Sequence, residues 1–160
     1  MDRAKAGNLA RNVALVTPLG LLGGAYVAQY GYGLAPCEMC WWQRYPHFAA
    51  VAFAALAWLR PPGSIMVVLA GLAMAISGLI GGFHAGVEYG WWEGLTACST
   101  STLGSGGSAL DAIMNAPLVR CDVAPWSLFG LSLAGWNFLL SGAAAMAILR
   151  LVPRNSKAES

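Results

Sequence analysis

Residues 61–87, PPGSIMVVLAGLAMAISGLIGGFHAGV, contain no Asp, Glu, Lys or Arg, and this stretch decides the fold. Two further stretches, 12–37 and 123–149, are equally free of charge, and residues 39–59 are interrupted only by Arg44. Each is as long as the ~20 residues with which an α-helix crosses a hydrocarbon core of about 30 Å. The pattern predicts an all-α membrane protein, a bundle of four transmembrane helices.

The composition agrees with a lipid environment. Of the 160 residues, 58% are hydrophobic and 10% are charged, and the mean hydropathy is +0.59, whereas soluble domains carry roughly a quarter charged residues. In lipid, backbone polar groups must be satisfied within the chain, which favours helices. We therefore predict a single integral membrane domain over residues 1–160, embedded in a lipid bilayer, with spans near 13–32, 40–59, 65–87 and 126–149 and outer loops near 33–39 and 88–125.

The second outer loop contains one further predicted element. Ser108-Ala-Leu-Asp111 resembles a capping box, and apolar residues follow it up to Pro117. We expect a short interfacial helix here, lying on the membrane surface.

Basic residues are segregated toward one end of the predicted spans. Seven of the nine Lys and Arg residues precede the first span, separate the second from the third, or follow the fourth, whereas the other end is mainly acidic. Since basic residues favour cytoplasmic loops, both termini are predicted to be cytoplasmic and all four cysteines to lie outside, where disulfides persist. Orientation thus accounts for the basic residues without a nucleic-acid partner. The seven are Arg3, Lys5, Arg11, Arg60, Arg150, Arg154 and Lys157.

Four cysteines, Cys37, Cys40, Cys98 and Cys121, allow three interpretations. Four thiolates could bind zinc, for which CxxC pairs are common, but the second pair is not a CxxC. Two purely structural disulfides are a second possibility. A CxxC disulfide is well suited to redox exchange with another disulfide, and this third interpretation accounts for the most features.

Polar residues lie close to the CxxC pair. Cys40, Arg44 and His47 are spaced i, i+4 and i+7, which puts them on one face of the second span. The helix N-terminus and the guanidinium favour a thiolate at Cys40. Arg44 is either a snorkelling anchor or a group that polarises a bound electron acceptor, since a guanidinium in a membrane needs a partner or an aqueous pocket.

Two histidines are further candidates. His84 forms an i, i+4 pair with Glu88 at the outer end of the third span, near the predicted depth of Arg44. We expect it either to pack or hydrogen-bond within the bundle or to contact the same acceptor. His47 lies deeper and is expected to be structural.

Several motifs resemble the bacterial disulfide bond formation protein B (DsbB) family. Cys37-Glu-Met-Cys40-Trp-Trp-Gln-Arg44-Tyr-Pro46-His47 matches the family's CxxC followed by Gln/Glu-Arg and Pro on the second span. The resemblance continues through residues 84–93, Cys98, Cys121 and residues 125–137, and covers most of residues 13–149.

The resemblance implies a quinone-dependent thiol oxidase of the bacterial inner membrane, with its cysteines in the periplasm. It implies that Cys98 exchanges with the thioredoxin-like periplasmic protein DsbA and that Cys121, once released, attacks Cys37. Cys40, thereby freed, would pass electrons to a non-covalently bound ubiquinone or menaquinone from the membrane pool. Arg44 and His84 would hold this quinone, and no metal is implied.

Two alternatives come from other classes. Vitamin K epoxide reductase-like enzymes combine the same ingredients, but that family places its quinone-proximal CxxC late in the chain, whereas here it is early. A non-enzymatic metal-binding membrane protein would use the four cysteines as ligands; metal analysis with a thiol count separates it from a redox enzyme.

Overall fold

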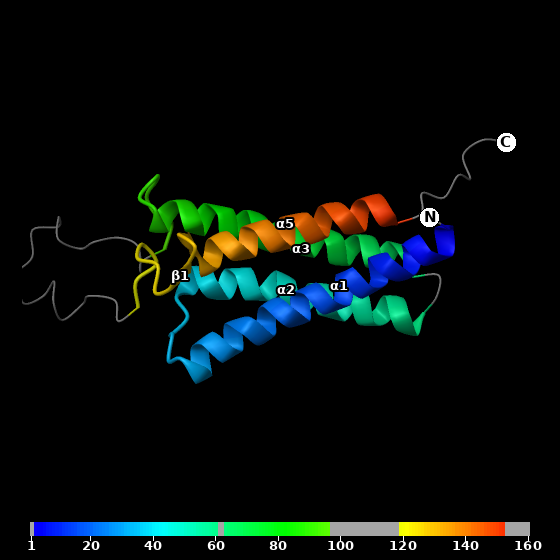
Figure 1. The fold of residues 1–160 in the computed structure, drawn as a ribbon, viewed down its shortest axis with the longest axis horizontal. Coiled ribbons are helices and arrows are strands. Elements are labelled where there is room, and N and C mark those ends of the chain that lie inside the picture. Colours follow the sequence, from blue (N-terminus) through cyan, green and yellow to red (C-terminus); the bar gives the residue numbers. More distant parts are fainter. Residues whose placement is uncertain (1, 61–62, 97–118, 153–160) are drawn as a thin grey trace, which may run out of the picture.

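The computed structural model describes residues 2–60, 63–96 and 119–152. Four long helices lie side by side, and a two-stranded antiparallel hairpin precedes the last of them (Figure 1). The elements are α1 (Arg3–Tyr26) with its π-helical continuation η1 (Val27–Gly31), α2 (Glu38–Leu59), α3 (Ser64–Glu88), β1 (Ser127–Leu128), β2 (Leu131–Ser132) and α5 (Leu133–Leu151).

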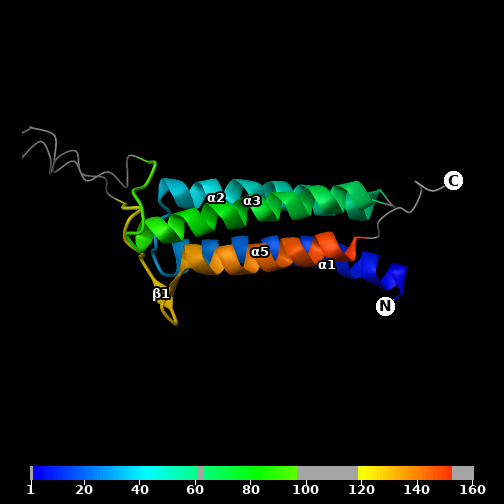
Figure 2. The same cartoon turned by 90° about the horizontal axis from the view of Figure 1, so that it is seen from above.

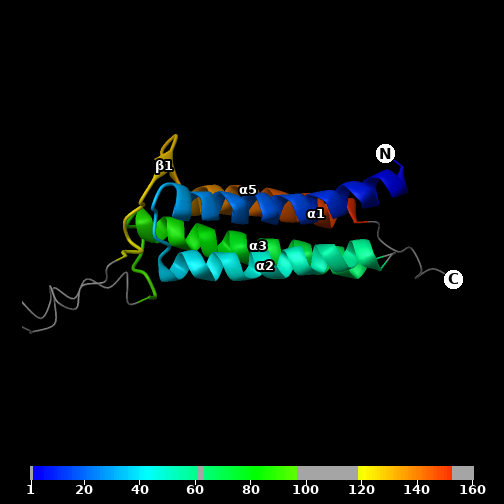
Figure 3. The ribbon, with the colours of Figure 1, turned by 90° about the horizontal axis from the view of Figure 1, so that it is seen from below.

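The helices form two layers. α2 and α3 make one layer and α1 and α5 the other (Figure 2). α3 packs against both α2 and α5, and α1 packs against α2 and α5. The start of α1, the end of α2 and the end of α5 share one end of the bundle, while the start of α2, the end of α3 and the hairpin share the other (Figures 1 and 3).

Length and composition suit a membrane for three of the helices. α1 with η1, α3 and α5 are long and apolar enough to span one. α2 has 22 residues but is not among these three, because its first half carries Trp41-Trp-Gln-Arg44-Tyr-Pro-His47. The predicted all-helical membrane bundle is therefore supported, while the crossing of the membrane by α2 stays a prediction. The predicted interfacial helix lies outside the described residues.

The predicted start of the fourth span was wrong. Residues 127–132, expected to be helical, form the hairpin instead, and α5 begins at Leu133. Phe129 and Gly130 adopt positive φ angles of 54° and 78°, as a tight hairpin turn requires. Ser132 then caps α5, since its Oγ accepts a hydrogen bond from Gly135 N at 3.1 Å.

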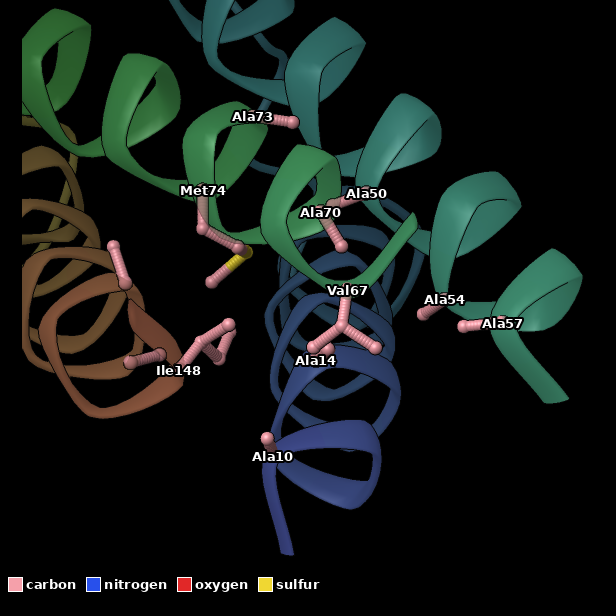
Figure 4. Packing of buried hydrophobic residues seen from close by; sticks show 12 residues of the cluster. Ala10, Ala14, Ala50, Ala54, Ala57, Val67, Ala70, Ala73, Met74 and Ile148 are labelled. Carbon is pink, nitrogen blue, oxygen red and sulfur yellow. The ribbon is translucent and has the colours of Figure 1, made fainter. Parts of the chain in front are cut away.

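The core consists mainly of small residues. Ala50, Ala54 and Ala57 lie on one face of α2 and are fully buried (Figure 4). In lipid, small residues allow backbones to approach closely, and van der Waals packing then holds the helices together. The remaining buried members are Ala10, Ala14, Val67, Ala70, Ala73, Met74, Ala144, Ala145 and Ile148.

Gly81 lies where the backbones of α3 and α5 approach each other closely. A Cβ atom at this position would lie 2.9 Å from Ala134 O and from Asn137 Nδ2, too close for either helix to stay in place. Gly81→Ala is expected to lower the free energy of unfolding by about 1–3 kcal/mol, as overpacking typically does. Thermal unfolding in detergent measures this, with Gly142→Ala as the control because nothing lies within 4 Å of its added Cβ. Equal stability of both variants would contradict the tight α3–α5 contact.

Candidate functional site: a dithiol beside a polar-lined cavity

The CxxC pair forms the first turn of α2. Cys37 is the N-cap residue, and its Sγ accepts a hydrogen bond from Cys40 N at 3.2 Å. The Cys37 thiol donates to Cys40 Sγ across 2.9 Å. That hydrogen bond, together with burial, raises the pKa of Cys37. Cys37 therefore keeps its proton, and Cys40 is the sulfur that carries negative charge when the pair loses one.

The different protonation of the two sulfurs predicts an order of alkylation. In the reduced protein near neutral pH, iodoacetamide is expected to label Cys40 well before Cys37, because the thiolate is the nucleophile and Cys37 is only 5% exposed. Mass spectrometry of peptides after a short exposure measures the order. The unfolded protein, in which both sulfurs are exposed thiols, serves as the control and should show similar labelling. Faster labelling of Cys37 in the folded protein would contradict the assignment.

Cys121 lies beside this pair although it is distant in sequence. Cys37, Met39, Val87 and Cys121 form one buried cluster, and Cys121 is fully buried. Thr96 Oγ1 donates to Cys121 Sγ at 3.4 Å. Two of the predicted redox cysteines are thus brought together: Cys37 from the first outer loop and Cys121 from the end of the second. Cys98 lies outside the described residues.

His84 joins the two segments that carry these cysteines. Its Nε2 lies 3.2 Å from Cys121 O and 3.7 Å from Cys37 Sγ. Its Nδ1 lies 2.8 Å from Gln43 Nε2, which also donates to Met39 O at 3.2 Å. Because that amide nitrogen donates, Nδ1 is the acceptor and Nε2 carries the ring proton. Both ring nitrogens are therefore engaged within the protein, so a contact between His84 and an acceptor would involve the ring face.

Arg44 is buried and has no carboxylate partner within residues 2–60, 63–96 and 119–152. It is only 6% exposed, and the two ion pairs found among the described residues do not include it. Its Nη1 donates to Gln29 Oε1 at 2.6 Å and its Nη2 to Ala25 O at 3.3 Å. The guanidinium also lies 5.1 Å from the centre of the Tyr26 ring and 4.9 Å from that of Trp41. Neutral dipoles and aromatic faces hold the cation, and its charge is not cancelled by an acid.

A cavity of about 250 Å³ connects these groups. α1 contributes small residues such as Gly20, Gly24 and Ala25, and α5 contributes apolar and aromatic ones such as Leu133 and Trp136. An apolar cavity with a few convergent polar groups suits a flat, hydrophobic ligand that has polar atoms at its edge. The polar lining is formed by Cys40, Gln43, Arg44, His47, His84, Glu88 and Asn137.

Three cavity-lining residues, Gln43, His47 and Asn137, belong to a buried hydrogen-bond network. Asn137 Nδ2 donates to Gln43 Oε1 at 2.9 Å, and Asn137 Oδ1 accepts from His47 Nε2 at 2.9 Å and from Ser141 Oγ at 2.7 Å. Ser77 Oγ donates to Gln43 O at 2.8 Å and lies 2.9 Å from His47 Nε2. The network ties α2 to α3 and α5, which is what a structural role for His47 requires.

Sequence reasoning missed several of these contacts. Gln29 and Asn137 were assigned no role, although a polar amide within an apolar span is a usable signal, because burying it without partners is costly. Glu88 was noted only as the neighbour of His84. The structure places all three around the same cavity or its arginine.

Three possible metal ligands also lie close together. The sulfurs of Cys37 and Cys40 and a ring nitrogen of His84 all lie within 4.8 Å of one another, and zinc accepts such donors. This differs from the four-thiolate site considered from the sequence. Zinc analysis of the reduced and oxidised protein, combined with a thiol count, separates metal binding from redox chemistry.

Known proteins similar to this chain point to one family. The family model described as "Disulfide bond formation protein DsbB" matches residues 8–151. "Disulfide bond formation protein B" of Azoarcus sp. (strain BH72) is 32% identical over 139 residues, covering 81% of this chain and 81% of the relative. The protein of the same name from Chromohalobacter salexigens is 32% identical over 147 residues, covering 83% and 80%.

A relative without an assigned function also matches. "Uncharacterized protein RP370" of Rickettsia prowazekii is 24% identical over 145 residues, covering 88% of this chain and 83% of the relative. No solved structure matches the chain significantly.

Proposed function

The chain belongs to the DsbB family of disulfide bond formation proteins, and from this premise we propose that it is a membrane thiol:quinone oxidoreductase. It reoxidises a periplasmic thioredoxin-like dithiol protein of the DsbA type and passes the electrons to ubiquinone or menaquinone. The observation that carries the proposal is the Cys37–Cys40 pair, which lies between buried Cys121 on one side and the cavity lined by Arg44 on the other.

The proposed route uses two disulfides in sequence. The partner's two thiols reduce the Cys98–Cys121 disulfide, which leaves the partner oxidised. The Cys121 thiolate attacks Cys37, breaks the Cys37–Cys40 disulfide and frees Cys40 as a thiolate. Cys98 then attacks Cys121, which re-forms the Cys98–Cys121 disulfide, breaks the Cys37–Cys121 bond and releases Cys37 as a thiol. The Cys37–Cys40 dithiol gives up two electrons through Cys40, which restores the Cys37–Cys40 disulfide. The quinone supplies the terminal redox chemistry, since it takes up two electrons and two protons to become quinol.

Energetics explain why a quinone is suited to this task. DsbA is the standard example of a strongly oxidising dithiol protein, with a reduction potential of about −120 mV. An ordinary structural disulfide lies below about −300 mV, so its use as the oxidant would be uphill by about 8 kcal/mol for two electrons. Transfer of the electrons to a respiratory quinone avoids this unfavourable reaction free energy.

The membrane orientation follows from the charge pattern. We propose an inner-membrane protein of four spans with both termini in the cytoplasm, since the start of α1 and the end of α5 lie at the end of the bundle that carries most basic residues. The cysteines and the hairpin then face the periplasm.

One experiment tests the proposed function. Purified protein receives a reduced thioredoxin-like partner and ubiquinone, or menaquinone in a parallel sample, and partner thiols and quinone absorbance are followed together. We expect one quinone to be reduced for each partner disulfide formed. Partner oxidation without quinone reduction, or no oxidation at all, would refute the proposal.

A further inference from the structure

Glu88 is a buried acid that the proposed electron route does not use. It is the last residue of α3, its side chain is 3% exposed, and it lines the cavity together with Cys40 and Arg44. Its Oε2 is buried and has no hydrogen-bond partner within the described part of the chain. Burying a carboxyl oxygen without a hydrogen-bond partner costs free energy. A hydrogen bond to a bound ligand, or a proton carried by the carboxyl group itself, would offset this cost.

The Glu88 carboxyl group lies beside the side chains of His84 and Ser132. Its Oε1 lies 3.8 Å from His84 Nε2, the nitrogen that carries the ring proton because Gln43 donates to Nδ1. The Nε2 proton is donated to Cys121 O at 3.2 Å, so His84 gives Oε1 no hydrogen bond, and Oε2 also has no hydrogen-bond partner among the described residues. Cys40, Arg44 and Glu88 line the same cavity, so the acid and the cation share it with the sulfur that gives up electrons.

The reaction needs an acid at this place. Reduction of a quinone to a quinol adds a proton to each of two oxygens, and the proposed electron route delivers only electrons. Arg44 can stabilise developing negative charge but does not give up a proton in proteins, and both ring nitrogens of His84 are engaged. Among the cavity-lining residues, Glu88 is the carboxyl group available for proton transfer.

We propose, on the basis of the proposed function, that Glu88 is the proton donor of the cavity, and that its carboxyl group delivers a proton to one quinone oxygen as Cys40 gives up electrons. The balance is complete. Cys37–SH, Cys40–S⁻, the Glu88 acid, quinone and one further proton from outer water are converted to the Cys37–Cys40 disulfide, Glu88 carboxylate, quinol and the proton that Cys37 releases. Glu88 then takes up a proton from the outer water. In the overall count, this uptake balances the proton that Cys40 released when it ionised.

Glu88→Gln tests this role because the amide keeps the size and polarity of the side chain but supplies no acid. We expect kcat for quinone reduction to fall on the order of 10²-fold or more, the usual contribution of general acid catalysis, with KM for ubiquinone changed less than about threefold. Exchange between the partner and the loop disulfide, measured without quinone, should be unchanged. Glu93→Gln is the matched control, since Glu93 is an exposed acid five residues further along.

Chemical rescue provides a second readout that a structural role would not produce. In Glu88→Ala, added formate should restore part of the lost kcat, while Cys40→Ser should gain nothing from it. Wild-type kcat in Glu88→Gln, loss of the quinone-independent exchange along with kcat, or absence of rescue by formate would each overturn the role of Glu88. If the wild-type protein itself reduces no quinone, the proposed function fails; if it does and Glu88→Gln matches it, only the inference on Glu88 fails.

Discussion

Replacing Cys40 with serine is expected to abolish quinone reduction while leaving exchange between the partner dithiol and the Cys98–Cys121 pair intact. Of the three described cysteines, Cys40 lines the cavity, whereas Cys37 belongs to the buried cluster with Cys121. A serine hydroxyl can accept the same hydrogen bond from the Cys37 thiol, but it forms no disulfide and carries no electrons. Turnover, followed by quinone absorbance, should therefore fall to background.

The reciprocal variant is the control for this prediction. Cys121→Ser should block oxidation of the partner, but its Cys37–Cys40 pair, reduced chemically, should still reduce ubiquinone in a single turnover. Quinone reduction at the wild-type rate in Cys40→Ser, or its loss from chemically reduced Cys121→Ser, would contradict the order in which the cysteines act.

The sequence predicted the features that depend on one helix at a time. The helical bundle followed from hydropathy, and the Cys40, Arg44 and Glu88 positions at the outer ends of α2 and α3 followed from spacing along the chain. The start of α5 could not be predicted in the same way, because residues 127–132 are apolar enough for a span. Their hairpin depends on two consecutive residues with positive φ, Phe129 and Gly130, and phenylalanine is not a typical residue for that conformation.

Contacts between helices were the harder part. Arg44 was expected near an acceptor, but its partner Gln29 comes from η1, and the network around Asn137 joins α2, α3 and α5. Such pairs depend on the rotation and crossing of the helices, which hydropathy does not determine. The proximity of Cys121 to Cys37 likewise came only from the family resemblance, since no spacing rule relates an outer-loop cysteine to a helix N-cap.

Arg44→Met is expected to weaken quinone binding more than any other change that leaves the four cysteines in place. The guanidinium is buried in the cavity wall and forms no ion pair with a carboxylate of the described residues, so its charge is available to an oxygen of the acceptor. Hydrogen bonds to charged groups are worth about 1.5–3 kcal/mol, and each 1.4 kcal/mol is tenfold in affinity. The apparent KM for ubiquinone should therefore rise about 10- to 100-fold.

Stability distinguishes this role from that of a membrane anchor. Methionine retains the apolar stem and removes a buried cation, so the thermal midpoint in detergent should change little, because the loss of the Gln29 and Ala25 hydrogen bonds is offset by the desolvation that is no longer required. Arg60→Met, at the exposed opposite end of α2, is the control and should leave KM unchanged. An unchanged KM in Arg44→Met, with or without a large fall in its thermal midpoint, would make Arg44 an anchor of α2 against α1. Only a residue that contacts the acceptor alters quinone affinity while the bundle stays intact.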